Sequence, residues 1–441
     1  MLKVRFDLGS RRRPDDLGDH RMHLIHRKTC RVCGSTALKP VIDLGEQYLQ
    51  GSFQKPGKEE PPLRKIPCTL SRCDPTQDEH ACGLLQMEHS VPPEVLYSAY
   101  WYRSGTNATM RNHLKNIAEE AEAMVNRNAI TALDIGCNDG TLLRTYSNKV
   151  EKFGIDPSDV ASEVKDGITV VKDLFPSPEL TQLLGERKVD IVTSIAMFYD
   201  LESPVDFAKN IRDVLAADGI WILEMSYMPF MLQMNSYDTI CHEHLEYYSL
   251  SVIEKILARA GLKAVRVATN DINGGSLRVY AARNTCLKYR KEEWVQQIRK
   301  MRQDEFDLEL DTDKPYRHFQ DRINVHKDKL NALLKGLKKD GKRIHIYGAS
   351  TKGNTILQWC GIDSRLIDMA AERNPDKYGA RTIGTDIPIV SEEESRSLKP
   401  DFYLVLPWHF QDEFLEREKK TLEGGTGMIF PLPEIRIVKS A

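Results

Sequence analysis

The sequence lacks a strong excess of charge, a long apolar run and the start of a secreted chain. Its 62 basic and 64 acidic residues give a formal net charge of −2, so the chain as a whole does not attract nucleic acid or an anionic membrane. No apolar run approaches the roughly 20 residues that span a bilayer, and the first residues lack the apolar segment of a signal peptide. We therefore expect a cytoplasmic protein that binds neither membrane nor nucleic acid.

The 441 residues are too many for one hydrophobic core and suit two or three domains. Residues 1–28 are basic, contain histidine and have no steady apolar period, so we expect a flexible tail there. The chain has nine cysteines. An odd number in a long chain without a secretion signal favours thiols and metal ligands over disulfides.

Five cysteines follow the tail, in a segment that we assign to a first domain over residues 29–93. Cys30 and Cys33 form a C-x-x-C pair, and Cys68, Cys73 and Cys82 come later. Four thiolates complete a tetrahedral zinc site, which stabilises a segment too small to fold on a hydrophobic core alone. Because Cys33 and Cys82 both precede a glycine, the predicted ligands are Cys30, Cys33, Cys73 and Cys82. The alternatives are cysteines that are only buried or redox-active, and a zinc ribbon that binds nucleic acid.

The rest of the chain is organised around the sequence ALDIGCNDGTLL, residues 132–143. A strand predicted over 130–135 enters a glycine-bounded turn and then a helix, so that the backbone can approach a ligand to which helix N–H groups point. The next predicted strand ends at Asp156, whose carboxylate can accept hydrogen bonds from two ribose hydroxyls. The loop has two glycines instead of the three of a dinucleotide fingerprint, which favours S-adenosylmethionine (SAM). The alternative is an ordinary strand-turn-helix of another α/β domain.

A third predicted strand, over 169–171, ends before Asp173, where methyltransferases often contact the adenine. Further strands over 189–194 and 219–225, with a helix over 204–215, fit a doubly wound, Rossmann-like sheet with the ligand over its carboxyl edge. We assign residues 94–288 to this domain. The expected cofactor-binding residues are Asp134, Gly136, Asn138, Asp139, Gly140, Asp156 and Asp173.

Two further stretches of this domain contain candidate substrate-binding or catalytic residues. The aromatic cluster that includes Tyr100 and Tyr102 either packs against the domain or lines a polar pocket. In His242-Glu243-His244 two imidazoles flank a carboxylate, and imidazole is the side chain best suited to take a proton near neutral pH. General base is the favoured role. The alternatives are structural histidines or a metal site, for which H-E-x-x-H and a third ligand are both missing.

The remaining chain restarts an α/β pattern after a charged stretch. A Gly-Gly turn before Ser276 and Arg278 either binds an anion or is a simple hairpin turn. Residues 289–340 are interpreted as a solvated helical connector, and 341–441 as a Rossmann-like domain. Its loop after a strand over 343–349 can bind phosphates, although the domain could instead only support the first. The expected substrate-binding residues are Ser276, Arg278, Ser350, Thr351, Lys352, Asn354 and His409.

Taken together, these motifs resemble the SAM-dependent sugar 3-C-methyltransferases, which act on nucleotide-linked 4-keto deoxysugars. The resemblance covers nearly everything after the tail and implies a zinc-binding N-terminal domain, a class I SAM domain and a C-terminal α/β domain that helps to bind the nucleotide sugar. Its motifs are CRVCG (30–34), DLGEQ (43–47), CGLLQ (82–86), DIGCNDGTLL (134–143), HEH (242–244), GGSLR (274–278), GASTKGNT (348–355) and LPWHF (406–410).

The resemblance also implies roles for single residues. The catalytic base falls on His244 with Glu243 beside it, and an aromatic substrate contact falls within Tyr100 to Tyr102. Methylation of C3 of a 4-keto-6-deoxy sugar then proceeds through an enolate, which hydrogen-bond donors must stabilise; Tyr100, Tyr102 and His242 are the candidates. The pathway would be deoxysugar biosynthesis for an antibiotic or polysaccharide, and the enzyme a monomer or homodimer.

One departure from the family concerns the residue before His-Glu-His, where several members have tyrosine and this chain has Cys241. It leaves open which sugar isomer is used, and the nucleotide is open as well (dTDP, GDP or another). Two other functions are compatible with the motifs: an O- or N-methyltransferase of another small molecule, and a zinc-ribbon nucleic-acid methyltransferase. The neutral charge balance argues against the last.

Overall fold

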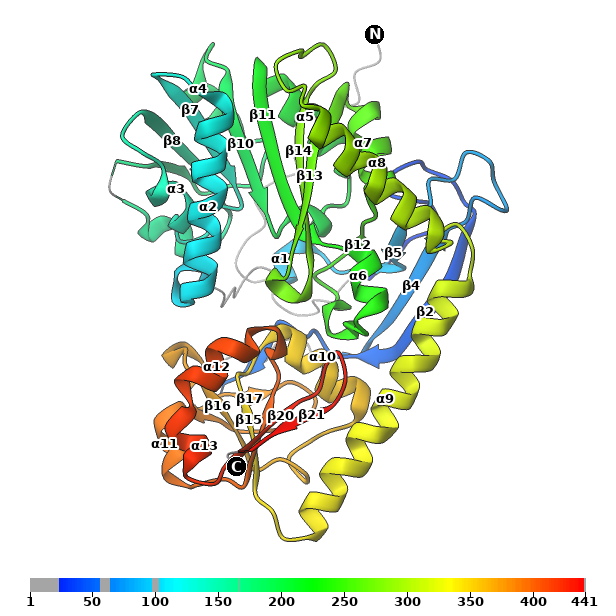
Figure 1. Cartoon of the computed structure of the whole chain (residues 1–441), viewed down its shortest axis with the longest axis vertical. Coiled ribbons are helices and arrows are strands. Elements are labelled where there is room, and N and C mark those ends of the chain that lie inside the picture. The colour runs from blue at the N-terminus through cyan, green and yellow to red at the C-terminus, as the bar shows by residue number, and fades with distance from the viewer. Residues whose placement is uncertain (1–23, 56–63, 97–102, 166, 440–441) are drawn as a thin grey trace, which may run out of the picture.

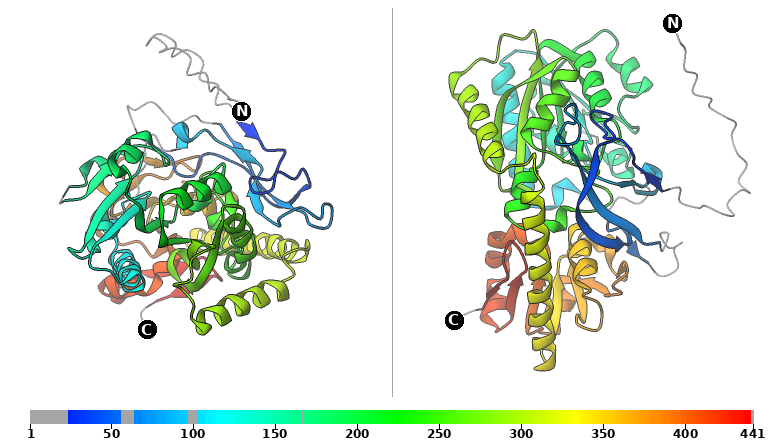
Figure 2. Two further views of the ribbon diagram at one scale, coloured as in Figure 1. Left: turned by 90° about the horizontal axis from the view of Figure 1, so that it is seen from above. Right: turned by 90° about the vertical axis from the view of Figure 1, so that its right-hand side faces the viewer.

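The computed structural model describes residues 24–55, 64–96, 103–165 and 167–439. Two α/β domains lie one above the other, and the N-terminal domain and the long helix α9 (Lys314–Lys339) run along the same side of both (Figures 1 and 2). Among the described helices, none is both long and apolar enough to cross a bilayer.

The central domain has a seven-stranded sheet in the order β13-β14-β11-β10-β7-β8-β9. All strands are parallel except β14, which pairs antiparallel with both β11 and β13. The order reverses between β7 and β10, which makes the carboxyl ends of these strands the switch point where a ligand binds in such sheets. The strands are β7 (Ile130–Ile135), β8 (Val150–Ile155), β9 (Thr169–Val171), β10 (Val189–Ile195), β11 (Leu215–Ser226), β13 (Leu262–Asn270) and β14 (Ser276–Arg283).

Both faces of this sheet are apolar because helices cover both. Along β7, Leu133 and Ile135 join one core cluster, whereas Ile130 and Ala132 join the other, as the period of two in a strand requires. Helices α2 (Ala108–Val125) and α3 (Thr141–Thr145) cover one face. The helices on the other face are α4 (Pro178–Leu184), α5 (Pro204–Val214) and α7 (Leu250–Arg259), and α8 (Glu292–Asp307) contributes to both clusters.

The N-terminal domain contains an antiparallel sheet in the order β12-β5-β4-β2, and one of its strands comes from the central domain. Strand β12 (Glu246–Tyr247) directly follows His-Glu-His and pairs with β5 (Leu85–Met87). The sheet continues with β4 (Ile66–Cys73) and β2 (Leu38–Gln47). The smaller elements are β1 (Ile25–His26) paired with β6 (His89–Ser90), and α1 (Pro93–Leu96).

The C-terminal domain has a six-stranded sheet in the order β18-β16-β15-β19-β20-β21, parallel except for the edge strand β21. The N-terminal domain is attached to it by β3 (Phe53–Gln54), which pairs with β17 (Arg381–Thr382). Its strands are β15 (Ile344–Tyr347), β16 (Met369–Glu372), β18 (Ile389–Ser391), β19 (Phe402–Val405), β20 (Gly427–Phe430) and β21 (Arg436–Val438). Its helices are α10 (Thr351–Cys360), α11 (Glu392–Ser397), α12 (Gln411–Arg417) and α13 (Lys419–Glu423).

Helix α9 differs from the solvated connector expected from its charge. Its apolar residues recur every three or four positions, so one face of the helix is buried while the charged face is solvated. Tyr316, Phe319 and Ile323 on this face join a core cluster with residues of β2 and of the C-terminal sheet. The many charged residues of this segment led to the prediction of a solvated helix, although its apolar residues have helical spacing. The short helix α6 (Met228–Gln233) also contributes to this cluster.

Candidate active site

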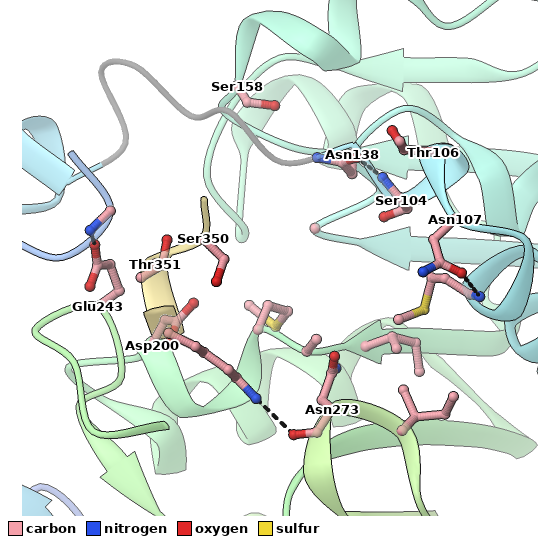
Figure 3. A pocket seen from close by; sticks show the side chains of 18 of the residues that line it. Ser104, Thr106, Asn107, Asn138, Ser158, Asp200, Glu243, Asn273, Ser350 and Thr351 are labelled. Atoms are coloured by element: carbon pink, nitrogen blue, oxygen red, sulfur yellow. Dashed lines mark hydrogen bonds between the residues drawn. The ribbon is translucent and has the colours of Figure 1, made fainter. Parts of the chain in front are cut away.

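A cavity of about 550 Å³ lies between the central and C-terminal domains. The loops after β7, β8, β9 and β10 form one wall, and the loop after β15 forms another, so the carboxyl ends of both parallel sheets meet here. The N-terminal domain contributes Gly51 and Phe53. Figure 3 shows Ser104 and Asn138 on one side of the cavity, and Ser350 and Thr351 on another. All three domains therefore form one site.

The turn after β7 approaches this cavity closely. Gly136 has a φ of 75° and Asn138 a φ of 49°, both in the left-handed region. A Cβ on Gly136 would lie 3.2 Å from the side chain of Met197, so the turn leaves little room for a side chain. The backbone N–H of Asn138 donates to Asp156 Oδ2 at 2.9 Å, and that of Ser158 donates to Oδ1 at 2.8 Å. These bonds fix the carboxylate at the cavity wall and leave it further lone pairs.

Most of the predicted cofactor residues line the cavity, but two do not. Asp139 accepts a hydrogen bond from the N–H of Gly105 at 2.8 Å and thereby fixes the loop that covers the turn. Gly140 is the N-cap of α3, where its φ of 72° favours glycine. Both residues shape the loop without facing the cavity. The predicted residues in the wall are Asp134, Gly136, Asn138, Asp156 and Asp173.

The composition of this wall fits SAM. A carboxylate at the end of β8 suits the two ribose hydroxyls, and the apolar side chains of Leu142, Leu174 and Phe175 suit the adenine. Leu174 is 55% exposed, although a leucine normally gains from burial. Ser104, Thr106 and Asn107, the small polar residues after the aromatic cluster, also line the cavity, although the sequence did not single them out as cofactor-binding residues.

His244 lines the same cavity with its tautomer fixed. Its Nδ1 is 2.7 Å from the carbonyl oxygen of Thr239, and because a carbonyl only accepts, Nδ1 is the donor. Burial and then the positive charge of Lys352 lower the pKa of His244 to about 3. The ring is therefore neutral near pH 7, and among the described residues none is hydrogen-bonded to its Nε2. The ring of Tyr199 lies beside it, with centroids 4.3 Å apart.

His242 points away from the cavity, in contrast to the expectation that it donates to the substrate. It is fully buried, and its Nδ1 is 2.7 Å from Gln50 Oε1 and its Nε2 3.3 Å from the carbonyl oxygen of Ile66. Glu243 does line the cavity, and its Oε1 accepts from the N–H of Gly51 at 2.7 Å (Figure 3). Burial raises the pKa of Glu243. The N-terminal domain thus fixes the segment that contains the candidate base.

The loop after β15 brings several predicted residues to the cavity. Ser350 is the N-cap of α10, and its Oγ accepts from the N–H of Gly353 at 3.0 Å. Lys352 Nζ donates to the carbonyl oxygen of Asn273 in the central domain at 2.7 Å (Figure 3). The predicted residues Ser350, Thr351, Lys352 and His409 all line the cavity.

Three other predicted substrate residues do not line it. Asn354 is buried and donates to the carbonyl oxygen of Gln50 at 2.7 Å. Ser276 Oγ donates to the carbonyl oxygen of Ile272 at 2.9 Å. Arg278 Nε donates to Glu224 Oε2 at 2.7 Å, because the antiparallel pairing of β14 with β11 places these residues opposite each other. The expected anion site is an internal ion pair instead.

Tyr100 and Tyr102 lie outside the described residues. Sequence reasoning also missed Gln50 and Gly51, which follow the DLGEQ motif in the chain. They contact His-Glu-His across about 190 residues of sequence. In the sequence, their place shortly after the DLGEQ motif was the one feature that pointed to these two residues.

The four predicted zinc ligands lie together at the N-terminal domain. Their sulfur atoms are all within 4.8 Å of one another, with Cys30 to Cys82 and Cys33 to Cys73 both at 3.4 Å. A tetrahedral site with Zn–S bonds of about 2.3 Å has sulfurs about 3.8 Å apart, so the set fits zinc. Cys68 lies elsewhere, 3.8 Å from Gln50 Nε2.

Three family models match the chain in succession. They are a zinc binding domain of methyltransferases over residues 30–97, a methyltransferase domain over 105–267 and a C-methyltransferase C-terminal domain over 271–433. C-methyltransferase NovU of Streptomyces niveus is 27% identical over 420 residues, which cover 93% of this chain and 97% of NovU. The match therefore includes all three domains.

Two solved structures are similar over less than half of this chain. The plantazolicin methyltransferase BpumL in complex with S-adenosylhomocysteine (SAH) is 13% identical with a TM-score of 0.32, over 40% of this chain and 86% of that one. Magnesium protoporphyrin IX methyltransferase of Synechocystis is 16% identical with a TM-score of 0.30, over 42% and 87%. The three family models and the relative identify the chain as a SAM-dependent methyltransferase that combines a zinc-binding domain, a methyltransferase domain and a C-methyltransferase C-terminal domain.

Proposed function

We propose that this enzyme methylates carbon 3 of a nucleotide-linked 4-keto-6-deoxy sugar, in deoxysugar biosynthesis. The observation that supports this most is His244, a neutral imidazole whose Nε2 has no hydrogen-bond partner among the described residues, in the wall of the cavity that also contains the turn after β7. A base of this kind suits removal of a proton from carbon, which O- and N-methylation of an already nucleophilic group do not need.

The C-terminal domain supplies the features that suit the nucleotide. The N-terminus of α10 opens into the cavity beside Ser350 and Thr351, and the positive end of a helix dipole favours a diphosphate. Lys377, whose Nζ donates to the carbonyl oxygen of Ala349 at 2.7 Å, adds a positive charge to the same wall. His409 lies in this part of the wall as well. We assign the diphosphate to this edge and the sugar to the space between it and His244.

The proposed chemistry begins with the C4 ketone, which makes the hydrogen on C3 acidic. Nε2 of His244 accepts this proton while the Thr239 carbonyl fixes the ring through Nδ1. Glu243, itself fixed by Gly51, borders the sugar. SAM, when bound by Gly136, Asn138 and Asp156, supplies an electrophilic methyl group to the carbanion. A neutral imidazole is too weak to ionise an isolated ketone, so a group that stabilises negative charge on the C4 oxygen is required.

A substrate panel tests this function. The purified protein is incubated with methyl-labelled SAM and 4-keto-6-deoxy sugars linked to dTDP, GDP and other nucleotides, and NMR locates the transferred methyl group. We expect a new C3–CH₃ bond with one nucleotide series. A methyl group on oxygen or nitrogen, or no transfer to any member, would refute the proposal.

The His244→Asn variant tests the base separately. It should lose both solvent exchange at C3 and methylation while SAM binding measured by calorimetry is retained, because the SAM loop is on another wall of the cavity. His318→Asn, on the exposed face of α9, is the matched control and should retain full turnover. Exchange at C3 in His244→Asn at the wild-type rate would exclude His244 as the base.

A further inference from the structure

We propose that Lys352 is a catalytic residue whose ammonium group stabilises the negative charge on the C4 oxygen when His244 removes the C3 proton. The two side chains line the same cavity from different domains. This inference rests on the proposed C-methylation of a ketone, and it assigns the charge-stabilising group that the reaction needs.

The ammonium group is positioned by contacts on both sides of the domain boundary. Lys352 is the second residue of α10, so its backbone belongs to the C-terminal domain. Its Nζ crosses to the central domain and donates to the carbonyl oxygen of Asn273 at 2.7 Å, a residue whose left-handed φ of 57° turns the chain at the cavity (Figure 3). An ammonium group has three protons. Among the described residues this is its one hydrogen bond, which leaves two protons for a ligand.

The charged and titratable groups around Lys352 come from two parts of the chain, residues 238–244 and His409. Asp238 in η4 (Tyr237–Thr239) is buried, and its Oδ2 accepts from Trp408 Nε1 at 2.9 Å. Cys241 and His244 follow in the same segment, and His409 lies in η7 (Trp408–Phe410). The positive charge of Lys352 contributes to the low pKa of both His244 and His409. Because Lys352 and His244 also line the same cavity, we infer that both act on the same part of a substrate.

Of the donors expected for this role, His242 is the one that the structure describes, and it is already bonded elsewhere. The ring nitrogens of His242 are bonded to the N-terminal domain. A tyrosine hydroxyl is absent before His-Glu-His, where Cys241 stands. A buried ammonium group acts on a nearby charge more strongly than it would in water, because little solvent screens it. Lys352 thus offers the C4 oxygen a full positive charge in place of a neutral hydrogen-bond donor.

The electrons balance without a further reactant. The C3–H pair becomes the C3–C4 double bond as Nε2 of His244 takes the proton, and the carbonyl π pair moves to the C4 oxygen beside Lys352. When the pair on oxygen re-forms the C4 carbonyl, the pair of the C3–C4 double bond forms the new bond from C3 to the methyl group that SAM supplies. The S–CH₃ bonding pair remains on sulfur. No oxidant, reductant or metal takes part.

The test measures solvent exchange at C3 without SAM, on the panel member that the wild-type enzyme methylates. Wild type should exchange the C3 proton for deuterium in D₂O, as followed by NMR. Lys352→Met should lose about 100-fold or more in exchange and in methylation, the usual effect of removing one oxyanion donor, while SAM affinity is unchanged. If wild type methylates no panel member at C3, the proposed function fails; if wild type does and Lys352→Met exchanges normally, only the role of Lys352 fails.

Two further variants separate catalysis from domain packing. In Lys352→Cys, alkylation with 2-bromoethylamine rebuilds a lysine-like ammonium group and should restore exchange at least ten-fold; no restoration in a folded protein that is alkylated at residue 352 and retains its zinc would contradict the proposal. Lys377→Met removes another half-buried lysine of the same cavity, and should raise KM for the nucleotide sugar with a much smaller loss of kcat. An equal loss of kcat in both methionine variants would point to general disruption of the cavity instead.

The pH profile gives an independent reading. Burial lowers the pKa of Lys352 below its usual value, so the ammonium group is lost, and exchange should fall, as pH rises through this lowered pKa. Lys352→Arg keeps its charge at higher pH and should move the alkaline limb upward, even if its maximal rate is lower. An alkaline limb unchanged in Lys352→Arg, or trapping of the substrate on Lys352 by borohydride, would overturn the electrostatic role.

Discussion

At the scale of single residues, Asp134 has a protonation equilibrium in the range where the enzyme works. It is 4% exposed, and its Oδ1 accepts from Thr193 Oγ1 at 2.6 Å. Burial raises the pKa of Asp134 to about 7, so a fraction of the free enzyme is protonated there at neutral pH. SAM is a cation and favours the ionised carboxylate in the same cavity.

SAM affinity should therefore increase with pH through about 7 and then level off, with proton release on binding below that pH. Asp134→Asn can still accept from Thr193 but has no proton to lose, so its affinity should be weaker at alkaline pH and independent of pH. Calorimetry in buffers of different ionisation enthalpy measures both quantities. Asp340→Asn, on the exposed end of α9, is the control. A wild-type affinity that is constant from about pH 6 to 8 would contradict this linkage.

The two histidines of His-Glu-His show what the sequence could and could not predict at this scale. Its chemistry indicated a base, and one of its two imidazoles does line the cavity. The choice between them depends on Gln50, which bonds to His242 across a sequence separation of 192 residues. Arg278 shows the same limit, because its partner Glu224 is on a neighbouring strand. A local sequence motif does not show which residues far away in the sequence bind to it.

At the scale of elements, the alternation of strands and helices predicted both Rossmann-like sheets, because each strand has its own apolar run and turn residues. The edge strand β12 could not be predicted in this way. It has two residues, and it exists because β5 of the N-terminal domain supplies its hydrogen-bond partner. Through β12, Gln50 and Gly51, the zinc-binding domain is attached to the catalytic segment on both sides of His244.

Loss of zinc should consequently reduce methyl transfer even though the metal is outside the cavity. Removing the ion, by a chelator or by Cys33→Ser, removes the metal–sulfur bonds that hold the segments around Cys30 and Cys33 and around Cys73 and Cys82 together. Strand β5 then no longer supports β12. We expect lower thermal stability and a fall in turnover, with SAM affinity less affected. Metal analysis, melting temperature and kcat measure this, and added zinc should restore the chelated protein.

Cys68→Ser is the matched control, because Cys68 is buried in the same domain but is not near the other four sulfurs. It should retain one zinc ion per chain. Loss of zinc in this variant, or full turnover in zinc-free protein, would contradict the arrangement described here.

At the scale of the whole molecule, helix α9 joins domains that the sequence divides. One core cluster includes Ile42 and Leu44 of β2, Phe319 and Ile323 of α9, and residues of the C-terminal sheet. Pairing of β3 with β17 adds a second connection between the same two domains. Charge and length predicted a connector in this region, whereas the buried stripe makes α9 part of a shared core.

Phe319→Ala should therefore destabilise the N-terminal and C-terminal domains together. Phe319 is fully buried, and removing such a side chain costs about 3–5 kcal/mol through lost burial and the cavity left behind. Val325→Ala on the same helix is the matched control, since Val325 is 53% exposed and the change should be within about 0.5 kcal/mol. Calorimetry and hydrogen exchange should show β2, α9 and β15 losing protection in parallel in Phe319→Ala. Exchange that increases in only one of the two domains would show that α9 packs on them independently, and the zinc-binding domain would then have to reach the active site through β12 alone.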